Sequence, residues 1–254
     1  MFVACNTLCF TREPLESALR HMAELEFDKI ELTIVEDGAH LRPSEVADDP
    51  DAAIHRLRQG PSLTPSALSL EFGDIDREGF LLRKRFEAMC RLAKPLTVAV
   101  LTIQAAPHDS PFEDEVKRLS TLAGIAMREG LVLAVETHSK TLTADPDAAV
   151  ELCKAVPGLG LTLDPSHYIQ GGHPDFDVVY PYVQNVHLRD TGKDPGEFQV
   201  RVGQGEIEYG RVVSQLERHG YDRGLTVSIL DRLENPFEVE VEVRKLKLLL
   251  ESLL

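Results

Sequence analysis

The sequence lacks long hydrophobic runs and any excess of basic residues. No apolar stretch approaches the roughly 20 residues that cross a bilayer, which argues against a membrane-spanning helix. The 27 Lys and Arg residues are outnumbered by 42 Asp and Glu residues, so the formal net charge is −15. An acidic chain without a basic cluster repels phosphate backbones. We therefore expect neither a membrane nor a nucleic acid as partner.

Cysteine is scarce as well. The four cysteines, Cys5, Cys9, Cys90 and Cys153, have neither the spacing of a zinc site nor the density of a disulfide framework. They are expected to be free thiols, which is typical of a cytoplasmic protein. The first residues include no basic segment ahead of the apolar ones, so we expect no signal peptide.

The chain does contain short apolar runs that alternate with segments of helical periodicity. Short runs of this kind predict buried parallel strands. The predicted strands cover residues 2–5, 29–33, 63–70, 96–102, 131–135, 159–163, 184–188 and 225–229. The predicted helices cover residues 14–25, 44–57 (with Ser44 as cap), 79–93, 111–130, 146–156, 176–180, 207–219 and 237–254. Strands that alternate with helices in a chain of 254 residues favour one α/β domain over residues 1–254, a (β/α)8 TIM barrel.

Three predicted strands in the second half of the chain end in polar clusters that contain Glu136, Asp164 and His187. Because the carboxyl ends of barrel strands share one rim, these side chains are expected to lie together, where barrel active sites lie. Two carboxylates and an imidazole are suitable ligands for a divalent metal. Each residue also has a structural explanation: an ion pair, a turn before Pro165, or a hydrogen-bonded core histidine.

These clusters resemble motifs of the sugar phosphate isomerase/epimerase family, within the xylose isomerase-like TIM-barrel superfamily. The similar segments, in order, are FDKIEL at 27–32, VETH at 135–138, LDPSH at 163–167, VHLRD at 186–190, GQGEI at 203–207 and GYDRGLTV at 220–227. The resemblance implies an isomerase or epimerase that acts on a small sugar, sugar phosphate or polyol-derived carbonyl compound. Proton transfer would pass through an enediolate stabilised by one divalent ion, Mn, Mg, Co or Zn. A homodimer is common in that family.

The resemblance also implies roles for individual residues. Glu136, Asp164 and His187 correspond to metal ligands, and Glu136 also to the catalytic base. His138, His167 and Arg189 correspond to substrate-binding positions. A solvated or partly buried loop histidine, or an arginine in a salt bridge, is the alternative for these three.

One position departs from the family pattern. Ser228 stands where the family has a strand-eight Glu that completes the metal site and serves as the second base. Serine is a poor ligand for a hard cation, so we expect weaker metal binding unless another group replaces the carboxylate. The candidates for that replacement are Asp231, Glu206, Glu208 and water.

The missing base leaves other functions open. A dehydratase or lyase of the same superfamily needs a less symmetrical pair of bases. A degenerate barrel that binds sugar without turnover is the alternative from another class. An abasic-site endonuclease is disfavoured, because the chain is acidic.

Overall fold

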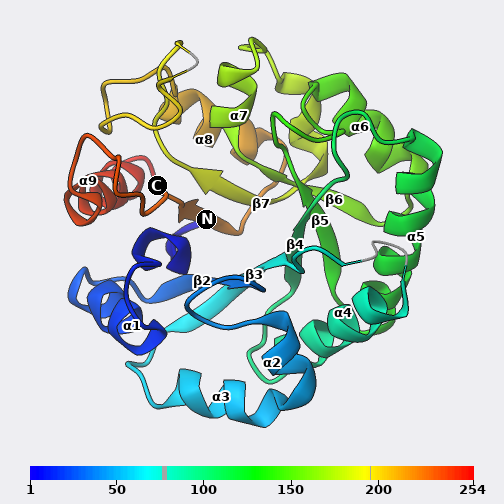
Figure 1. Ribbon diagram of the computed structural model, residues 1–254. Coiled ribbons are helices and arrows are strands. Elements are labelled where there is room, and N and C mark those ends of the chain that lie inside the picture. Colours follow the sequence, from blue (N-terminus) through cyan, green and yellow to red (C-terminus); the bar gives the residue numbers. More distant parts are fainter. Residues whose placement is uncertain (76–78, 195) are drawn as a thin grey trace.

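Eight strands pair in the order of the sequence and close into a parallel barrel in the computed structural model (Figure 1). The structure describes residues 1–75, 79–194 and 196–254. The first strand pairs with both the second and the eighth, which closes the barrel. The strands are β1 (Phe2–Asn6), β2 (Lys29–Val35), β3 (Thr64–Glu71), β4 (Val100–Gln104), β5 (Val132–Glu136), β6 (Leu159–Leu163), β7 (Val183–Leu188) and β8 (Gly224–Val227). The predicted (β/α)8 TIM barrel is confirmed.

Helices form the outer ring of the barrel (Figure 1). They are α1 (Leu15–Glu24), α2 (Pro43–Asp48), α3 (Pro50–Arg58), α4 (Phe80–Ala93), α5 (Phe112–Arg128), α6 (Pro146–Ala155), α7 (Pro165–Gln170), α8 (Tyr209–Arg218) and α9 (Val239–Glu251). The described chain also contains two 3-10 helices: η1 (Thr7–Phe10) lies between β1 and α1, and η2 (Asp177–Tyr182) lies between α7 and β7. Each long helix turns an apolar stripe inward. In α1, for example, Leu15, Leu19 and Met22 are buried at helical spacing, and burial of each such side chain contributes roughly 2 kcal/mol.

The predicted helix over 44–57 is divided in two. Pro50 cannot continue a helix, because it has no N–H group and disfavours helical geometry in the residue before it. Asp49 accordingly has φ −146° and ψ 86°, and its side chain accepts a hydrogen bond from the N–H of Ala52 in α3. Ser44 lies inside α2, and Arg42 is the residue that precedes the helix, so the predicted cap is wrong.

Strand β4 begins four residues later than its apolar run. Thr97 has φ +56° and lies in a turn between α4 and β4, which removes the first residues of the predicted strand. The strand instead extends to Gln104. Helix α7 directly after β6 was not predicted, although Asp164 and Pro165 form a helix start of the same kind as Asp145 and Pro146 of α6.

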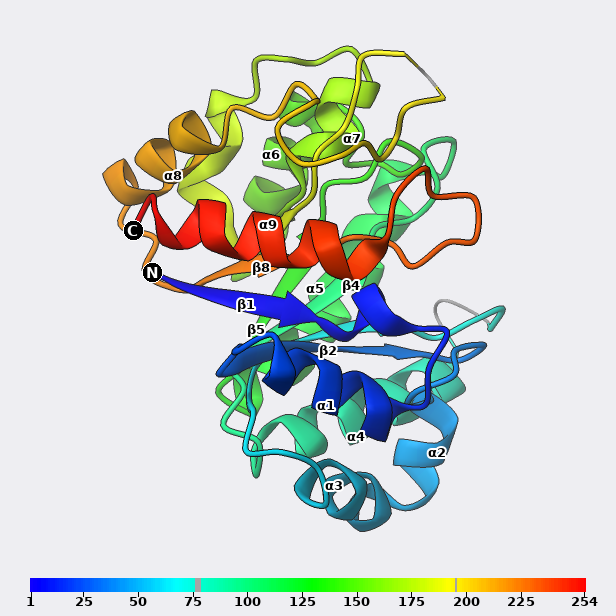
Figure 2. The ribbon, with the colours of Figure 1, turned by 90° about the vertical axis from the view of Figure 1, so that its left-hand side faces the viewer.

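The carboxyl ends of the strands lie at one end of the barrel. In Figure 2 the arrowhead of β1 points to the same side as the loop between β8 and α9.

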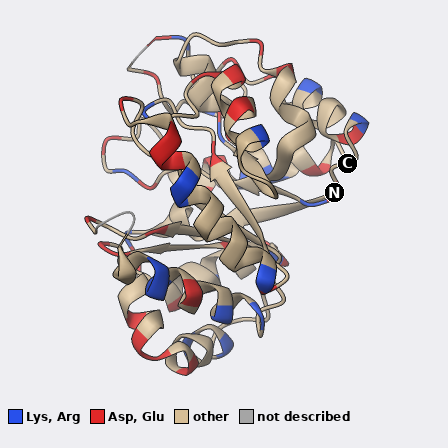
Figure 3. Cartoon of the chain, turned by 90° about the vertical axis from the view of Figure 1, so that its right-hand side faces the viewer, with Lys and Arg blue, Asp and Glu red and all other residues tan. Residues whose placement is uncertain are grey.

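Lys and Arg are interspersed with Asp and Glu over the helices and loops in Figure 3. Within the described ranges, no helix is long and apolar enough to cross a membrane. The four cysteines are free and buried.

Candidate metal centre and active site

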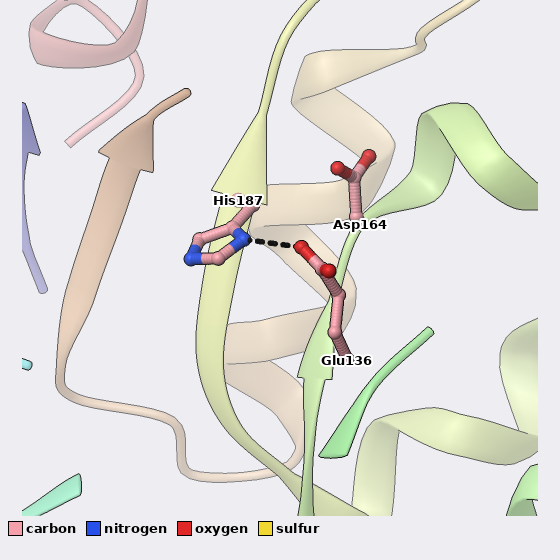
Figure 4. Close-up of side chains that lie close together, drawn as sticks. All are labelled: Glu136, Asp164 and His187. Carbon is pink, nitrogen blue, oxygen red and sulfur yellow. Dashed lines mark hydrogen bonds and ion pairs between the residues drawn. The ribbon is translucent and has the colours of Figure 1, made fainter. Parts of the chain in front are cut away.

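Glu136, Asp164 and His187 lie together at the carboxyl ends of β5, β6 and β7, as predicted. One ligand atom from each lies within 4.8 Å of the others. Figure 4 shows that Glu136 and His187 point toward one another, with the Asp164 carboxylate beside them. Asp164 and His187 are buried, and the Glu136 side chain is 15% exposed. The chain thus places two carboxylates and an imidazole around one point, and Glu136 is the most exposed of the three.

His187 is held between two carboxylates. Its Nδ1 lies 2.8 Å from Glu136 Oε1, and its Nε2 lies 2.8 Å from Glu31 Oε1. Burial alone would lower the pKa of His187, but the charges and hydrogen bonds of Glu31 and Glu136 raise this pKa well above its usual value. Burial likewise opposes ionisation of Glu136, yet the hydrogen bond and charge of His187 lower the pKa of Glu136 to about 2. Glu136 is therefore ionised at neutral pH.

Glu31 is a site residue that the sequence analysis missed. It belongs to β2, is fully buried inside the barrel, and accepts a second hydrogen bond at Oε2 from Asn185 Nδ2 at 3.0 Å. A glutamate is almost never fully buried unless it is paired. Its position in the apolar strand KIELTIV was the available signal. Glu31 fixes the ring of His187 from the side opposite Glu136.

Asp164 is oriented by its own helix and by an arginine. Its Oδ1 accepts hydrogen bonds from Ser166 N at 3.0 Å and Ser166 Oγ at 2.5 Å, which is the N-cap geometry of α7. Its Oδ2 lies 2.7 Å from Arg189 Nη2 but accepts no hydrogen bond of good geometry from the described residues. One lone pair of a buried carboxylate thus remains available for a ligand.

Arg189 joins the Asp164 side of the site to β8. Its Nη1 donates to the carbonyl oxygen of Ser228 at 3.1 Å, and its Nη2 also lies 3.1 Å from His167 Nε2. Because a guanidinium only donates, His167 Nε2 must accept, and the proton of the neutral ring lies on Nδ1, facing Ser139 Oγ at 3.2 Å. Burial lowers the pKa of His167 to about 4, which agrees with a neutral ring.

His138 stacks against His167, with ring centroids 4.0 Å apart. Burial also lowers the pKa of His138 below its ordinary value. His138, His167 and Arg189 all line the cavity above the metal-ligand candidates. The three residues expected to contact substrate are therefore brought to one place, although Arg189 is also the ion-pair partner of Asp164.

No other carboxylate of the described chain occupies the place of the strand-eight Glu beside Ser228. Asp231 forms an ion pair with Arg12 at 2.5 Å, and its Oδ2 accepts from Arg12 N. Glu206 pairs with Lys193, and Glu208 lies near Arg211 on α8. None of the three acidic residues lines the cavity. Asp231, Glu206 and Glu208 are thus paired with other residues. Glu136, Asp164 and His187 remain as the three candidate ligands.

The cavity at the barrel mouth has a volume of about 290 Å³. Besides the residues above, its wall includes Asn6, Phe198 and Arg232, none of which was singled out from the sequence. Asn6 is 1% exposed, and its Nδ2 has no hydrogen-bond partner among the described residues; the same holds for Arg189 Nε. Unpaired buried donors on a cavity wall are suited to a polar ligand.

The chain matches the family described as xylose isomerase-like TIM barrel over residues 19–248. This match spans most of the sequence, and the chain belongs to that family. Among curated proteins, no sequence is similar enough to count as a match.

Three solved structures share the fold at low sequence identity. The probable 3-DHS dehydratase AsbF from Bacillus anthracis is 16% identical, with TM-score 0.76 and 99% of each chain covered. A D-tagatose 3-epimerase-like protein is 21% identical, with TM-score 0.73, and covers 100% of this chain and 98% of its own. A xylose isomerase-like TIM barrel protein from Mycobacterium smegmatis, in complex with magnesium, is 19% identical, with TM-score 0.73, and covers 99% and 97%.

Proposed function

We propose that this protein is a divalent-metal-dependent isomerase or epimerase of a small sugar, sugar phosphate or related carbonyl compound. The observation that carries the proposal is the convergence of Glu136, Asp164 and His187 within 4.8 Å beside the cavity at the barrel mouth, which Glu136 and His187 line. Epimerase-like proteins among the solved structures with this fold support the same reaction class.

The residues present fit a single divalent ion. Glu136 and Asp164 offer carboxylate oxygens, and Asp164 Oδ2 is buried without a hydrogen-bond partner in the described chain. His187 would bind through Nδ1 while Nε2 keeps its hydrogen bond to Glu31, an arrangement that is common behind metal-binding histidines. When bound, the ion would polarise neighbouring carbonyl and hydroxyl oxygens of the substrate. Structures with the same fold that hold magnesium or zinc support this assignment.

Glu136 is the group placed to move a proton. It is the most exposed of the three candidates and lines the cavity, so its carboxylate can reach a proton on the carbon beside a carbonyl. His167 and Arg189 bound the same cavity, where Arg189 Nε has a free donor for a substrate oxygen. Asn6 Nδ2 supplies a further donor on the β1 side.

The absence of a carboxylate at Ser228 favours one second candidate. Epimerisation through two faces needs a proton acceptor on each side of the substrate, but in the described chain only Glu136 supplies a carboxylate from the ligand cluster to the cavity. Elimination of water needs one base and one acid that need not be equivalent. A dehydratase or lyase is therefore the alternative reaction, and AsbF is a solved structure of this fold described as a probable dehydratase.

The test is a substrate panel with chelator-stripped protein to which Mn²⁺ is returned. Ketoses, aldoses, their phosphates and sugar acids are incubated in deuterated water, and products are followed by NMR. Deuterium at a carbon next to the carbonyl without loss of water identifies an epimerase or isomerase. A new double bond identifies a dehydratase. Binding without any turnover, in wild type and in Glu136→Gln alike, would contradict the enzymatic proposal and leave a sugar-binding barrel.

A further inference from the structure

The two sides of the cavity carry opposite charge. The acidic residues on its wall, Glu71 and Glu136, come from β3 and β5. Its arginines, Arg189 and Arg232, follow β7 and β8. A cavity of this kind orients a ligand that has a negative group at one end.

Arg232 differs from Arg189 in having no acidic partner among the residues that the structure describes. The Arg189 guanidinium lies against Asp164 at 2.7 Å. No carboxylate of the described residues lies within ion-pair distance of Arg232, and its neighbour Asp231 is committed to Arg12. Arg232 is exposed, so water solvates its charge. Its guanidinium group can therefore pair with an incoming anion.

The loop that carries Arg232 is held in place by side-chain hydrogen bonds. Gln199 Oε1 accepts from Leu230 N at 2.6 Å, and Gln199 Nε2 donates to Asn235 Oδ1 at 2.7 Å. Asn235 Nδ2 in turn donates to Leu230 O at 2.8 Å. These bonds tie the loop after β8 to the segment that contains Phe198, so Arg232 is presented by an ordered framework.

Phe198 lies against both arginines. Its ring centroid is 4.5 Å from Arg189 Cζ and 5.8 Å from Arg232 Cζ, and the His167 ring packs on it at 5.0 Å. An aromatic face next to a guanidinium restricts where that cation can lie. The ring therefore positions two guanidinium groups on one side of the cavity, and one of them, that of Arg189, bonds the Ser228 carbonyl oxygen.

We propose that the substrate carries a carboxylate or phosphate group, which Arg232 binds on the β8 side of the cavity next to the place that Ser228 leaves without a carboxylate. An acidic side chain at position 228 would neutralise and occupy this region. Serine leaves this part of the cavity wall neutral beside Arg189, which bonds the Ser228 carbonyl oxygen, so an anionic group of the substrate can enter there. The inference rests on the proposed function, because it treats the cavity as a substrate site.

Three probes with one carbon skeleton test this inference: D-glucose, D-glucuronate and D-glucose 6-phosphate. Binding to the full chain with Mn²⁺ present is measured by ligand-observed NMR for wild type, Arg232→Gln and Arg232→Lys. Arg211→Gln is the matched control, because Arg211 is a half-exposed arginine on α8 outside the cavity, paired with Asp177.

At least one anionic probe is expected to bind wild type about tenfold more tightly than glucose, the usual size of a charged hydrogen bond. This preference should vanish in Arg232→Gln, weaken in Arg232→Lys, which lacks the planar fork, and persist in Arg211→Gln. The ratio of the dissociation constants of D-glucuronate and D-glucose 6-phosphate distinguishes a carboxylate substrate from a phosphate substrate. If neither anion binds better than glucose, or if the preference survives in Arg232→Gln, the inference is wrong. Turnover of neutral sugars alone would reject it while leaving the proposed function intact.

Discussion

The two halves of the candidate site pair their buried charged groups in different ways. On the β2–β5–β7 side, the imidazole of His187 lies between the carboxylates of Glu31 and Glu136, 2.8 Å from each. On the β6–β8 side, the carboxylate of Asp164 faces the guanidinium of Arg189, which also bonds the Ser228 carbonyl oxygen. The first half has the arrangement of a metal-binding histidine with a carboxylate behind it. The second half has a fixed cation and no fourth acidic ligand.

The two sides of the site are therefore suited to different roles. The β2–β5–β7 side is built for ligation and proton transfer, since the carboxylates of Glu31 and Glu136 both bond the ring of His187. The β6–β8 side is built to receive an oxygen-rich group, since Arg189 Nε remains unpaired within the described chain, as does Asn6 Nδ2 on the neighbouring β1. Substitutions in the two halves should therefore have different consequences.

The largest effect is expected on the first side, at Glu136. Glu136→Gln removes the cluster carboxylate that lines the cavity while keeping the size of the side chain. Turnover of the substrate found in the NMR panel should fall by about 10²–10⁴-fold, the contribution of general base catalysis. Steady-state assays at saturating Mn²⁺ measure this loss. A variant that retains more than half of the wild-type rate would assign the base to another residue.

Glu31→Gln should produce the next largest effect. It leaves Glu136, Asp164 and His187 unchanged but replaces the carboxylate that bonds His187 Nε2 with a neutral amide. Loss of such a partner typically weakens metal affinity by about 10–100-fold. Calorimetric titration with Mn²⁺ measures the change. Thr102→Val is the control, because the buried Thr102 bonds Asn185 but, among the described residues, has no hydrogen bond to His187. An unchanged affinity in Glu31→Gln would make Glu31 a purely structural carboxylate.

Ser228→Glu tests the second side. Adding a charged oxygen at the end of β8 should raise Mn²⁺ affinity by about tenfold, since hard cations gain from each carboxylate ligand. The same change should reduce binding of the anionic probes. Ser228→Gln, similar in size and neutral, should do neither. Tighter anion binding in Ser228→Glu would contradict the assignment of this side to a negative substrate group.

The smallest effect concerns a histidine that resembles His187 only in being buried. His40 Nε2 lies 3.2 Å from Phe10 O and 3.0 Å from Glu13 O, two carbonyl oxygens rather than two carboxylates. Burial lowers the pKa of His40 and outweighs the hydrogen bonds to these two carbonyl oxygens, which raise it.

Because the folded state binds the His40 proton less readily than the unfolded state, the protein should lose stability as the pH falls below about 6.5, the usual histidine pKa. The loss amounts to about 1.4 kcal/mol for each unit by which the pKa is lowered. Urea unfolding at pH 7 and pH 5 measures it. His40→Gln should show a smaller difference between the two pH values, and an equal difference would assign the pH dependence to other groups.

The barrel and the metal-ligand candidates were predictable from the sequence because both depend on local patterns. Short apolar runs between helices define the strands, and a polar residue at the end of a parallel strand must lie at the common rim. Glu136, Asp164 and His187 each stand at such an end. The start of β4 was not predictable in this way, because Leu96 and Thr97 look like strand residues and only the turn geometry excludes them.

The remaining site residues depend on contacts between distant segments. Glu31 is separated by 156 positions from His187. Its place in an apolar strand indicates burial, but nothing local says which side chain it meets. Phe198 and Arg232 lie in loops without periodicity, where spacing carries no information about which side chains meet. The ion pair of Asp231 with Arg12, which removes Asp231 as a replacement ligand, is likewise visible only in three dimensions.

The most direct test of the account is titration of the chelator-stripped protein with Mn²⁺ by calorimetry, for wild type, Glu136→Ala and Asp164→Asn. The account predicts one ion per wild-type chain and a large loss of affinity in both variants. Negligible binding by all three proteins, or equal binding by all three, would contradict the claim that these side chains form a metal centre.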